Sequence, residues 1–172
     1  MNENQLKELM DKPEARKRIS IIKTTVVKER SMLYGARQIN SSHLAAGLVN
    51  ELYENADREI LIACFLDSKC NPMAMEIIAI GSIDTCIVSP REVFKSAILS
   101  NAKNIIIFHN HPSGDSMPSS EDISVTKRLI DAGELLGISV LDHIIIGFGN
   151  SYHSIREAGA VSFDSKPQLY MK

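Results

Sequence analysis

The sequence predicts an α/β or α+β protein, in which helices pack on a mixed β-sheet. Three observations support this class. Helix-type and strand-type patterns interleave along the chain, the continuous apolar run at 104–108 is typical of a strand covered on both faces, and residues 119–136 combine helical periodicity with start and stop signals. At 172 residues the chain is long enough for one sizeable core. We therefore expect one domain over residues 18–160, between an N-terminal tail (1–17) and a C-terminal tail (161–172).

The N-terminal part of the chain predicts little regular structure. Residues 5–10 favour a short helix, and Pro13 interrupts it because proline has no amide hydrogen to donate. Residues 19–27 are rich in β-branched side chains, which favours a strand.

The next segments predict a helix and a hairpin. A helix is expected over 42–55, capped by Ser41 or Ser42. Its apolar face would consist of Leu44, Leu48 and Leu52. Two strands over 59–67 and 75–80 follow and are separated by turn residues, so we expect them to pair as a hairpin.

The second half of the chain alternates helices and strands. A helix is expected from Pro90 to Asn101, with proline in its first turn. The central strand 104–108 and the helix 119–136 follow, and Gly137 ends that helix. Residues 138–146 and 152–155 supply the last strands.

Composition indicates an ordinary globular protein. Apolar residues make up 44% of the chain and charged residues 23%. No apolar run approaches the roughly 20 residues that cross a bilayer, and the polar start has no signal-peptide core, so we expect a cytoplasmic protein. Cys64, Cys70 and Cys86 form no C-x-x-C pair, which argues against a disulfide framework or a thiolate zinc site. Cys64 is expected in the core.

Charge is distributed unevenly along the chain. The formal net charge is -2, yet residues 12–37 contain eight basic groups against Glu14 and Glu29, a local excess of +6. Such a stretch permits contact with DNA or an acidic partner, but a basic stretch is more often a solvated face.

The residues at the end of the central strand indicate a metal site. His109 and His111 are two residues apart, so both side chains leave the strand on one face. A hydrolytic Zn²⁺ site needs a third protein ligand and an open position for water. The loop with Pro112 and Gly114 turns the chain into the next helix, where Asp122 in the first turn supplies a carboxylate.

Each part of this pattern also has a structural interpretation. Ser119-x-x-Asp122 has the form of a capping box, in which the two side chains serve only the helix start. An H-x-H pair alone is a weak signal, because two of five histidines in 172 residues can fall at this offset by chance. Only the combination favours a metal.

The combined pattern H-x-H-x7-S-x2-D, formed by His109, His111, Ser119 and Asp122, resembles the signature of JAB/MPN (JAMM) metalloproteases. The stretches HNHPSGD, SPREVFKSAILSNA, TKRLIDAGELLGI and LDHIIIG are similar to the RadC-like branch of that family. The likeness extends over roughly residues 20 to 157. It implies a cytidine deaminase-like fold, a zinc ion held by the two histidines and Asp122, and peptidase or isopeptidase activity.

The resemblance also implies roles for further residues. An upstream glutamate acts as general acid/base in that family, and Glu59 occupies the matching position, with Glu76 as the alternative. Ser119 would stabilise the oxyanion or orient the attacking water. Asp115 is expected to be structural, and His143 is either a hydrogen-bonded core residue or a support of the site. His43 and His153 have no supporting context.

Two other functions stay open at this point. One is a DNA-repair-associated accessory protein with a structural or vestigial zinc site, and the other is a metal-dependent nuclease. Longer RadC proteins carry a helix-hairpin-helix region, and residues 1 to 50 contain no matching glycine-rich hairpin, which weakens a DNA role. A zinc deaminase would need H-x-E and P-C-x-x-C, and neither is present.

Overall fold

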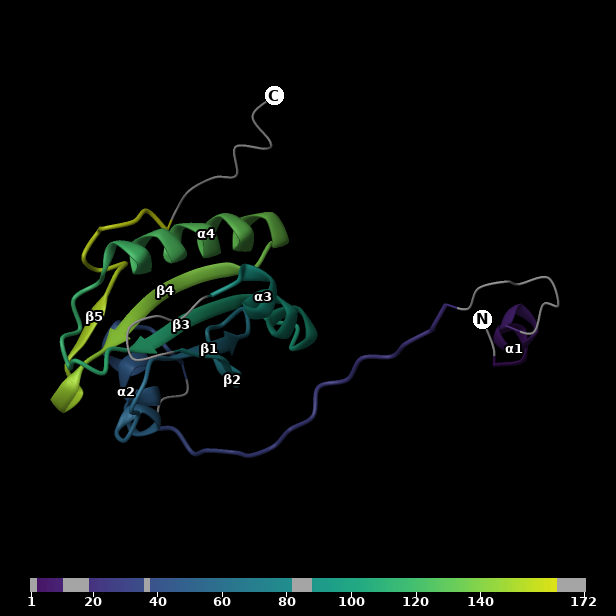
Figure 1. The fold of residues 1–172 in the computed structure, drawn as a ribbon, viewed down its shortest axis with the longest axis horizontal. Coiled ribbons are helices and arrows are strands. Elements are labelled where there is room, and N and C mark those ends of the chain that lie inside the picture. Colours follow the sequence, from purple (N-terminus) through teal and green to yellow (C-terminus); the bar gives the residue numbers. More distant parts are fainter. Residues whose placement is uncertain (1–2, 11–18, 36–37, 82–87, 164–172) are drawn as a thin grey trace, which may run out of the picture.

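The structure is a computed structural model that describes residues 3–10, 19–35, 38–81 and 88–163. It contains, in chain order, α1 (Glu3–Met10), α2 (Ser42–Tyr53), β1 (Ile60–Leu66), β2 (Pro72–Ile80), α3 (Pro90–Leu99), β3 (Asn104–Asn110), α4 (Ser120–Leu136), β4 (Ser139–Ile146), the 3-10 turn η1 (Phe148–Asn150) and β5 (Tyr152–Ser154). Figure 1 shows α2, α3 and α4 arranged around one sheet. The expected α/β class with a mixed sheet is confirmed.

The five strands are ordered β2-β1-β3-β4-β5. β1 pairs antiparallel with both β2 and β3, whereas β3 and β4 run parallel and are connected by α4. β1 and β2 form the expected hairpin. The carboxylate of Asp67 closes its turn by accepting hydrogen bonds from the amides of Lys69 (2.8 Å) and Asn71 (2.9 Å).

Two apolar cores lie on the two faces of the sheet. On one face α3 and α4 cover alternate strand residues such as Ile105 and Ile107, and on the other face α2 covers Ile106 and Phe108. Every residue of β3 is buried, as expected for the central strand. Because side chains alternate along a strand, His109 points to the α4 face and Asn110 to the α2 face.

Helix α4 begins and ends where the sequence predicts. Ser119 is the N-cap, and Gly137 ends the helix in the left-handed conformation (φ +70°). The crossover therefore delivers the first turn of α4 to the end of β3, where the histidines lie.

Two expectations of local structure are wrong. Residues 19–27 form no strand and are exposed throughout, because strand propensity describes fit to a pleated, half-buried surface and no described strand pairs with them. In α2 only Leu48 of the three leucines is buried, while Leu44 and Leu52 are 38% and 45% exposed. The buried stripe of α2 runs through alanine, valine and tyrosine instead: Ala45, Ala46, Val49 and Tyr53.

The expected chain ends are partly described. The helix near the N-terminus is present as α1, and Pro13 lies outside the described residues. Val161 and Phe163 pack against the α3–α4 core, so the first residues of the expected C-terminal tail lie on the domain. Cys64 is fully buried, as expected, and Cys86 is outside the described residues. Within the described residues, none of the helices is long and apolar enough to cross a membrane.

Candidate metal centre

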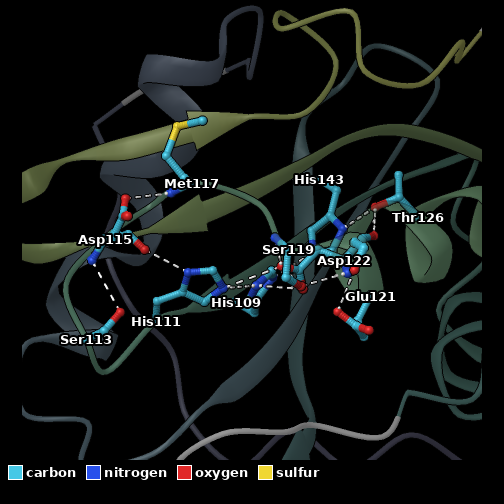
Figure 2. A network of polar contacts seen from close by, with 11 residues as sticks. His109, His111, Ser113, Asp115, Met117, Ser119, Glu121, Asp122, Thr126 and His143 are labelled. Carbon is cyan, nitrogen blue, oxygen red and sulfur yellow. Dashed lines mark hydrogen bonds and ion pairs between the residues drawn. The ribbon is translucent and has the colours of Figure 1, made fainter.

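The structure brings His109, His111 and Asp122 together in a group that could hold a metal ion. The two Nε2 atoms are 3.0 Å apart, and Oδ1 of Asp122 lies 3.2 Å from Nε2 of His109. Oδ2 of Asp122 lies 3.5 Å from Nε2 of His111. All three side chains are largely buried, with 5%, 14% and 17% of their surfaces exposed. Figure 2 shows them pointing toward one another.

Backbone hydrogen bonds hold the loop that carries His111. Its amide donates to the carbonyl of Ile146 (3.0 Å), which continues the line of pairing between β3 and β4 by one residue. Gly114 then turns the chain at φ +84°. A Cβ atom on this residue would lie only 2.1 Å from the ring of Phe148. A side chain there would need both a strained backbone and movement of Phe148, so glycine keeps this loop tight.

Asp122 also belongs to a capping box, the interpretation that competes with a metal in the sequence. Its Oδ2 accepts hydrogen bonds from the amide (2.7 Å) and the hydroxyl (2.6 Å) of Ser119, and its own amide donates to the Ser119 hydroxyl (3.2 Å). Its Oδ1 faces His109. The cap fixes the carboxylate beside the histidines, so the two interpretations are compatible.

Hydrogen bonds assign the protonated nitrogen of His111. Its Nδ1 lies 2.7 Å from the backbone carbonyl of Asp115. A carbonyl only accepts, so Nδ1 carries the hydrogen and Nε2 of the neutral ring has a free lone pair. The lone pair points into the group. Asp115 thus acts through its backbone, and its side chain accepts from the amide of Met117 (3.0 Å), in agreement with a structural role.

A chain of buried groups assigns His109 in the same way. The Thr126 hydroxyl donates to the carbonyl of Asp122 (2.6 Å) and therefore accepts from Nδ1 of His143 (2.6 Å). Burial lowers the pKa of His143 well below its ordinary value, so the ring is neutral and its Nε2 accepts from Nδ1 of His109 (2.8 Å). Nε2 of His109 is left with a lone pair that faces Asp122 (Figure 2).

With both rings neutral, the Nε2 lone pairs of His109 and His111 and the carboxylate of Asp122 therefore face one another. Such an arrangement requires a cation, which is a proton in the metal-free protein. The hydrogen bond with Asp122 accordingly raises the pKa of His111. Burial by itself would raise the pKa of Asp122, but hydrogen bonds from His109 and His111 outweigh it and hold that pKa well below its usual range. The chemistry of these donors fits a divalent metal ion.

Glu59 lies at the entrance to β1, close to the group. Leu61 pairs with His109, so continuing the same register puts Glu59 beside His111. The hydrogen bond that His111 donates to Asp122 is the main cause of its raised pKa, and the charge of Glu59 adds a smaller contribution. Glu59 is half-buried. The alternative, Glu76, is exposed on β2, and its carboxylate adds to Glu92 in raising the pKa of Lys95 on α3.

Asn110 holds the backbone on both sides of Glu59. Its side-chain oxygen accepts from the amide of Ile60 (2.8 Å), and its side-chain nitrogen donates to the carbonyl of Arg58 (3.0 Å). The side chain is on the α2 face and is buried. Asn110, which lies between His109 and His111, thus fixes the backbone of Glu59.

Asn110 and Thr126 were not singled out in the sequence. An amide side chain between two histidines at the end of an apolar strand is a signal for the first, and a threonine one turn after Asp122 is a signal for the second. His143 turns out to be both a hydrogen-bonded core residue and a neighbour of His109. His43, against the Tyr152 ring at 6.2 Å, and the half-buried His153 are not part of the group.

Comparison with known proteins agrees with this arrangement. The model of a family described as "RadC-like JAB domain" matches residues 39–160. A UPF0758 protein of Methanococcoides burtonii is 48% identical over 126 residues, which is 73% of this chain and 55% of that protein. A UPF0758 protein of Desulforamulus reducens is 50% identical over 115 residues, 67% of this chain and 50% of that protein. The chain spans about half the length of these curated relatives. The matched region contains α2 to β5 and the whole His/His/Asp group, and the chain belongs to the RadC-like JAB domain family.

Proposed function

We propose that this chain is a zinc-dependent hydrolase that cleaves peptide or isopeptide bonds, with zinc held by His109, His111 and Asp122. The observation that carries the proposal is the convergence of Nε2 of His109, Nε2 of His111 and the Asp122 carboxylate, with Nδ1 of each ring turned to another hydrogen-bond partner. Two ligands about 2.0–2.1 Å from a tetrahedral zinc ion lie roughly 3.3 Å apart. The Nε2–Nε2 distance of 3.0 Å, the distance of 3.2 Å from His109 to Oδ1 of Asp122 and the distance of 3.5 Å from His111 to Oδ2 bracket that value.

When bound, zinc supplies Lewis-acid polarisation and the lowered water pKa on which hydrolysis at neutral pH depends. Glu59 is proposed as the general base that takes the proton of the attacking water and then transfers it to the leaving amine. Its half-buried place at the entrance to β1 supports this role, and Asn110 fixes its backbone. Protonation of the amine is needed because an amide anion is a very poor leaving group.

Ser119 has two roles in the proposal. In the free protein its hydroxyl hydrogen points to Asp122 at 2.6 Å and keeps the carboxylate turned toward the histidines. During hydrolysis the same hydroxyl is proposed to donate to the developing oxyanion. Ser119→Ala is therefore expected to lower kcat and also to weaken zinc binding.

Paired glutamate variants test this function. Protein purified with zinc is assayed for metal content and for turnover of fluorogenic peptides and of a lysine-linked isopeptide. Glu59→Gln should keep its zinc and lose about 100- to 10,000-fold in turnover. Glu76→Gln is the matched control and should behave like the wild-type protein.

Two results would contradict the proposal. If Glu59→Gln stays active while Glu76→Gln does not, the general base is Glu76. If zinc-loaded wild-type protein cleaves duplex DNA and none of the peptide or isopeptide substrates, the chain is a nuclease.

A further inference from the structure

The segment between α1 and α2 exposes many apolar side chains. All described residues from 19 to 35 are exposed, and we call residues 19–27 the N-terminal arm. Ile19, Ile22 and Val27 are 88%, 81% and 78% exposed. Figure 1 shows the arm running away from the domain. Soluble proteins rarely leave such a run of aliphatic residues in water, so the arm has the composition of a strand that lacks a neighbour.

In the part of the chain that the structure describes, one edge of the sheet has no neighbouring strand. β2 is the end strand of the sheet and has nine residues, and among the described residues it pairs only with β1. Met73, Ile77 and Ile80 on it are 44%, 55% and 61% exposed. Long apolar edges are normally shortened or charged, because their free backbone groups recruit other strands. Ile80 also lines a shallow hollow beside the end of α2, together with Leu52 and Ile60.

The arm cannot cover β2 of its own chain along its length. Hydrogen bonds from Ile39 to Cys70 (3.0 Å) and from Tyr34 to Pro72 (3.3 Å) hold the chain beside the first residue of β2. Antiparallel pairing from that point would place residues 26–34 along β2, so only Val26 and Val27 of the arm could reach the strand of their own chain, and residues 19–25 would run past its end. Pairing of residues 26–34 within one chain is therefore the competing arrangement, and it predicts a monomer.

Parallel pairing within one chain fails for lack of length. If residues 19–27 ran parallel to β2, the arm would end beside Ile80, whereas Tyr34 is held beside Pro72 at the other end of the strand. Residues 28–34 would then have to lead back along the whole length of β2. They reach at most about 25 Å, whereas the nine-residue strand is about 26 Å long. Nothing would remain for the turn. A second copy of the chain has neither restriction.

The charges of the two surfaces are complementary. Lys23 lies in the arm and Lys28 directly follows it, and both are exposed. Glu76 is exposed on β2, and Glu51 lines the hollow beside it, where the charges of Asp57 and Arg58 pair with each other. Opposite charges flanking an apolar strand favour one partner and register over others.

From these observations we propose that the N-terminal arm of one copy adds as a strand to β2 of a second copy, in a reciprocal homodimer. Backbone hydrogen bonds along β2 would give the affinity, and the exposed aliphatic side chains of both surfaces would be buried together. The two contacts are equivalent by two-fold symmetry.

The mass of the full chain in solution tests this proposal, measured by size-exclusion chromatography with light scattering. The wild-type protein should have twice the mass of one chain. An arm variant (Ile22→Asp with Val26→Asp) and an edge variant (Ile77→Asp with Ile80→Asp) should each raise the dimer dissociation constant about 100-fold or more, the loss expected when two aliphatic side chains of an interface become carboxylates. All four residues are exposed in the single chain, so circular dichroism should show both variants folded. Leu135→Asp changes an equally exposed residue of α4 and should leave the dimer intact.

Mixing the two variants distinguishes exchange between chains from pairing within one chain. The arm variant keeps a good edge and the edge variant keeps a good arm, so an equimolar mixture should recover one contact and form a heterodimer. A wild-type protein that stays monomeric at high concentration overturns the proposal. So do variants that remain dimeric, and a mixture that stays monomeric.

Discussion

Replacing Thr126 by valine removes one hydroxyl from the buried chain behind His109 and keeps the shape of the side chain. That hydroxyl accepts from Nδ1 of His143 and donates to the carbonyl of Asp122, each at 2.6 Å, and Thr126 has no exposed surface. An N–H group left without an acceptor in the interior costs about 1–3 kcal/mol.

His143 avoids that cost by moving its hydrogen to Nε2, where it meets His109. His109 must then carry its own hydrogen on Nε2, the nitrogen that faces Asp122. Metal binding has to reverse both shifts. Groups that orient a metal-binding histidine are worth about 10- to 100-fold in metal affinity, which is about 1.4–2.8 kcal/mol. The zinc dissociation constant of Thr126→Val should rise by that factor.

Competition with a chromophoric chelator measures the affinity, and ¹⁵N NMR of the metal-free protein reports the tautomer of His109. Thr126→Ser is the matched control. It loses a buried methyl group and some stability but keeps the hydroxyl, so its zinc affinity should stay within about twofold of the wild type. The reasoning is refuted if Thr126→Val binds zinc as tightly as Thr126→Ser.

Three further predictions concern other parts of the structure. Asn110→Ala should lower the free energy of unfolding by about 1–3 kcal/mol, because the amide of Ile60 and the carbonyl of Arg58 lose their partner; it should also lower kcat more than zinc content, and full activity with unchanged stability would contradict the role of this side chain. Cys64 has a pKa raised to about 12 by burial, so iodoacetamide at neutral pH should modify the half-buried Cys70 and leave Cys64 intact until the protein unfolds, as peptide mass spectrometry would show. Gly137→Ala should lower the free energy of unfolding, measured with urea, by about 1–2 kcal/mol, because alanine is strained at φ +70°. The added Cβ would meet no neighbour, so this cost comes from the backbone alone; a stabilised variant would show that the left-handed turn is not maintained.

Much of the fold could be predicted because its signals are local. The apolar run of β3, the capping sequence of α4 and Gly137 each specify structure through neighbouring residues. The His/His/Asp group follows from the same signals, since one strand end and one helix start bring all three side chains together.

The remaining features depend on contacts between distant segments. The link from His109 to Thr126 requires the parallel register that sets His143 beside Ile107, with its shift between Ile105 and Ile106. No local pattern encodes that shift. The prediction of a strand at 19–27 is wrong for a related reason, because strand propensity does not say whether a neighbouring strand is available for pairing.

The proposed metal centre is tested most directly by X-ray diffraction from crystals grown with zinc, with data collected on both sides of the zinc absorption edge. The account predicts one strong anomalous peak within bonding distance of Nε2 of His109, Nε2 of His111 and a carboxylate oxygen of Asp122. It is contradicted if that position has no peak and Asp122 contacts only Ser119 at the start of its own helix.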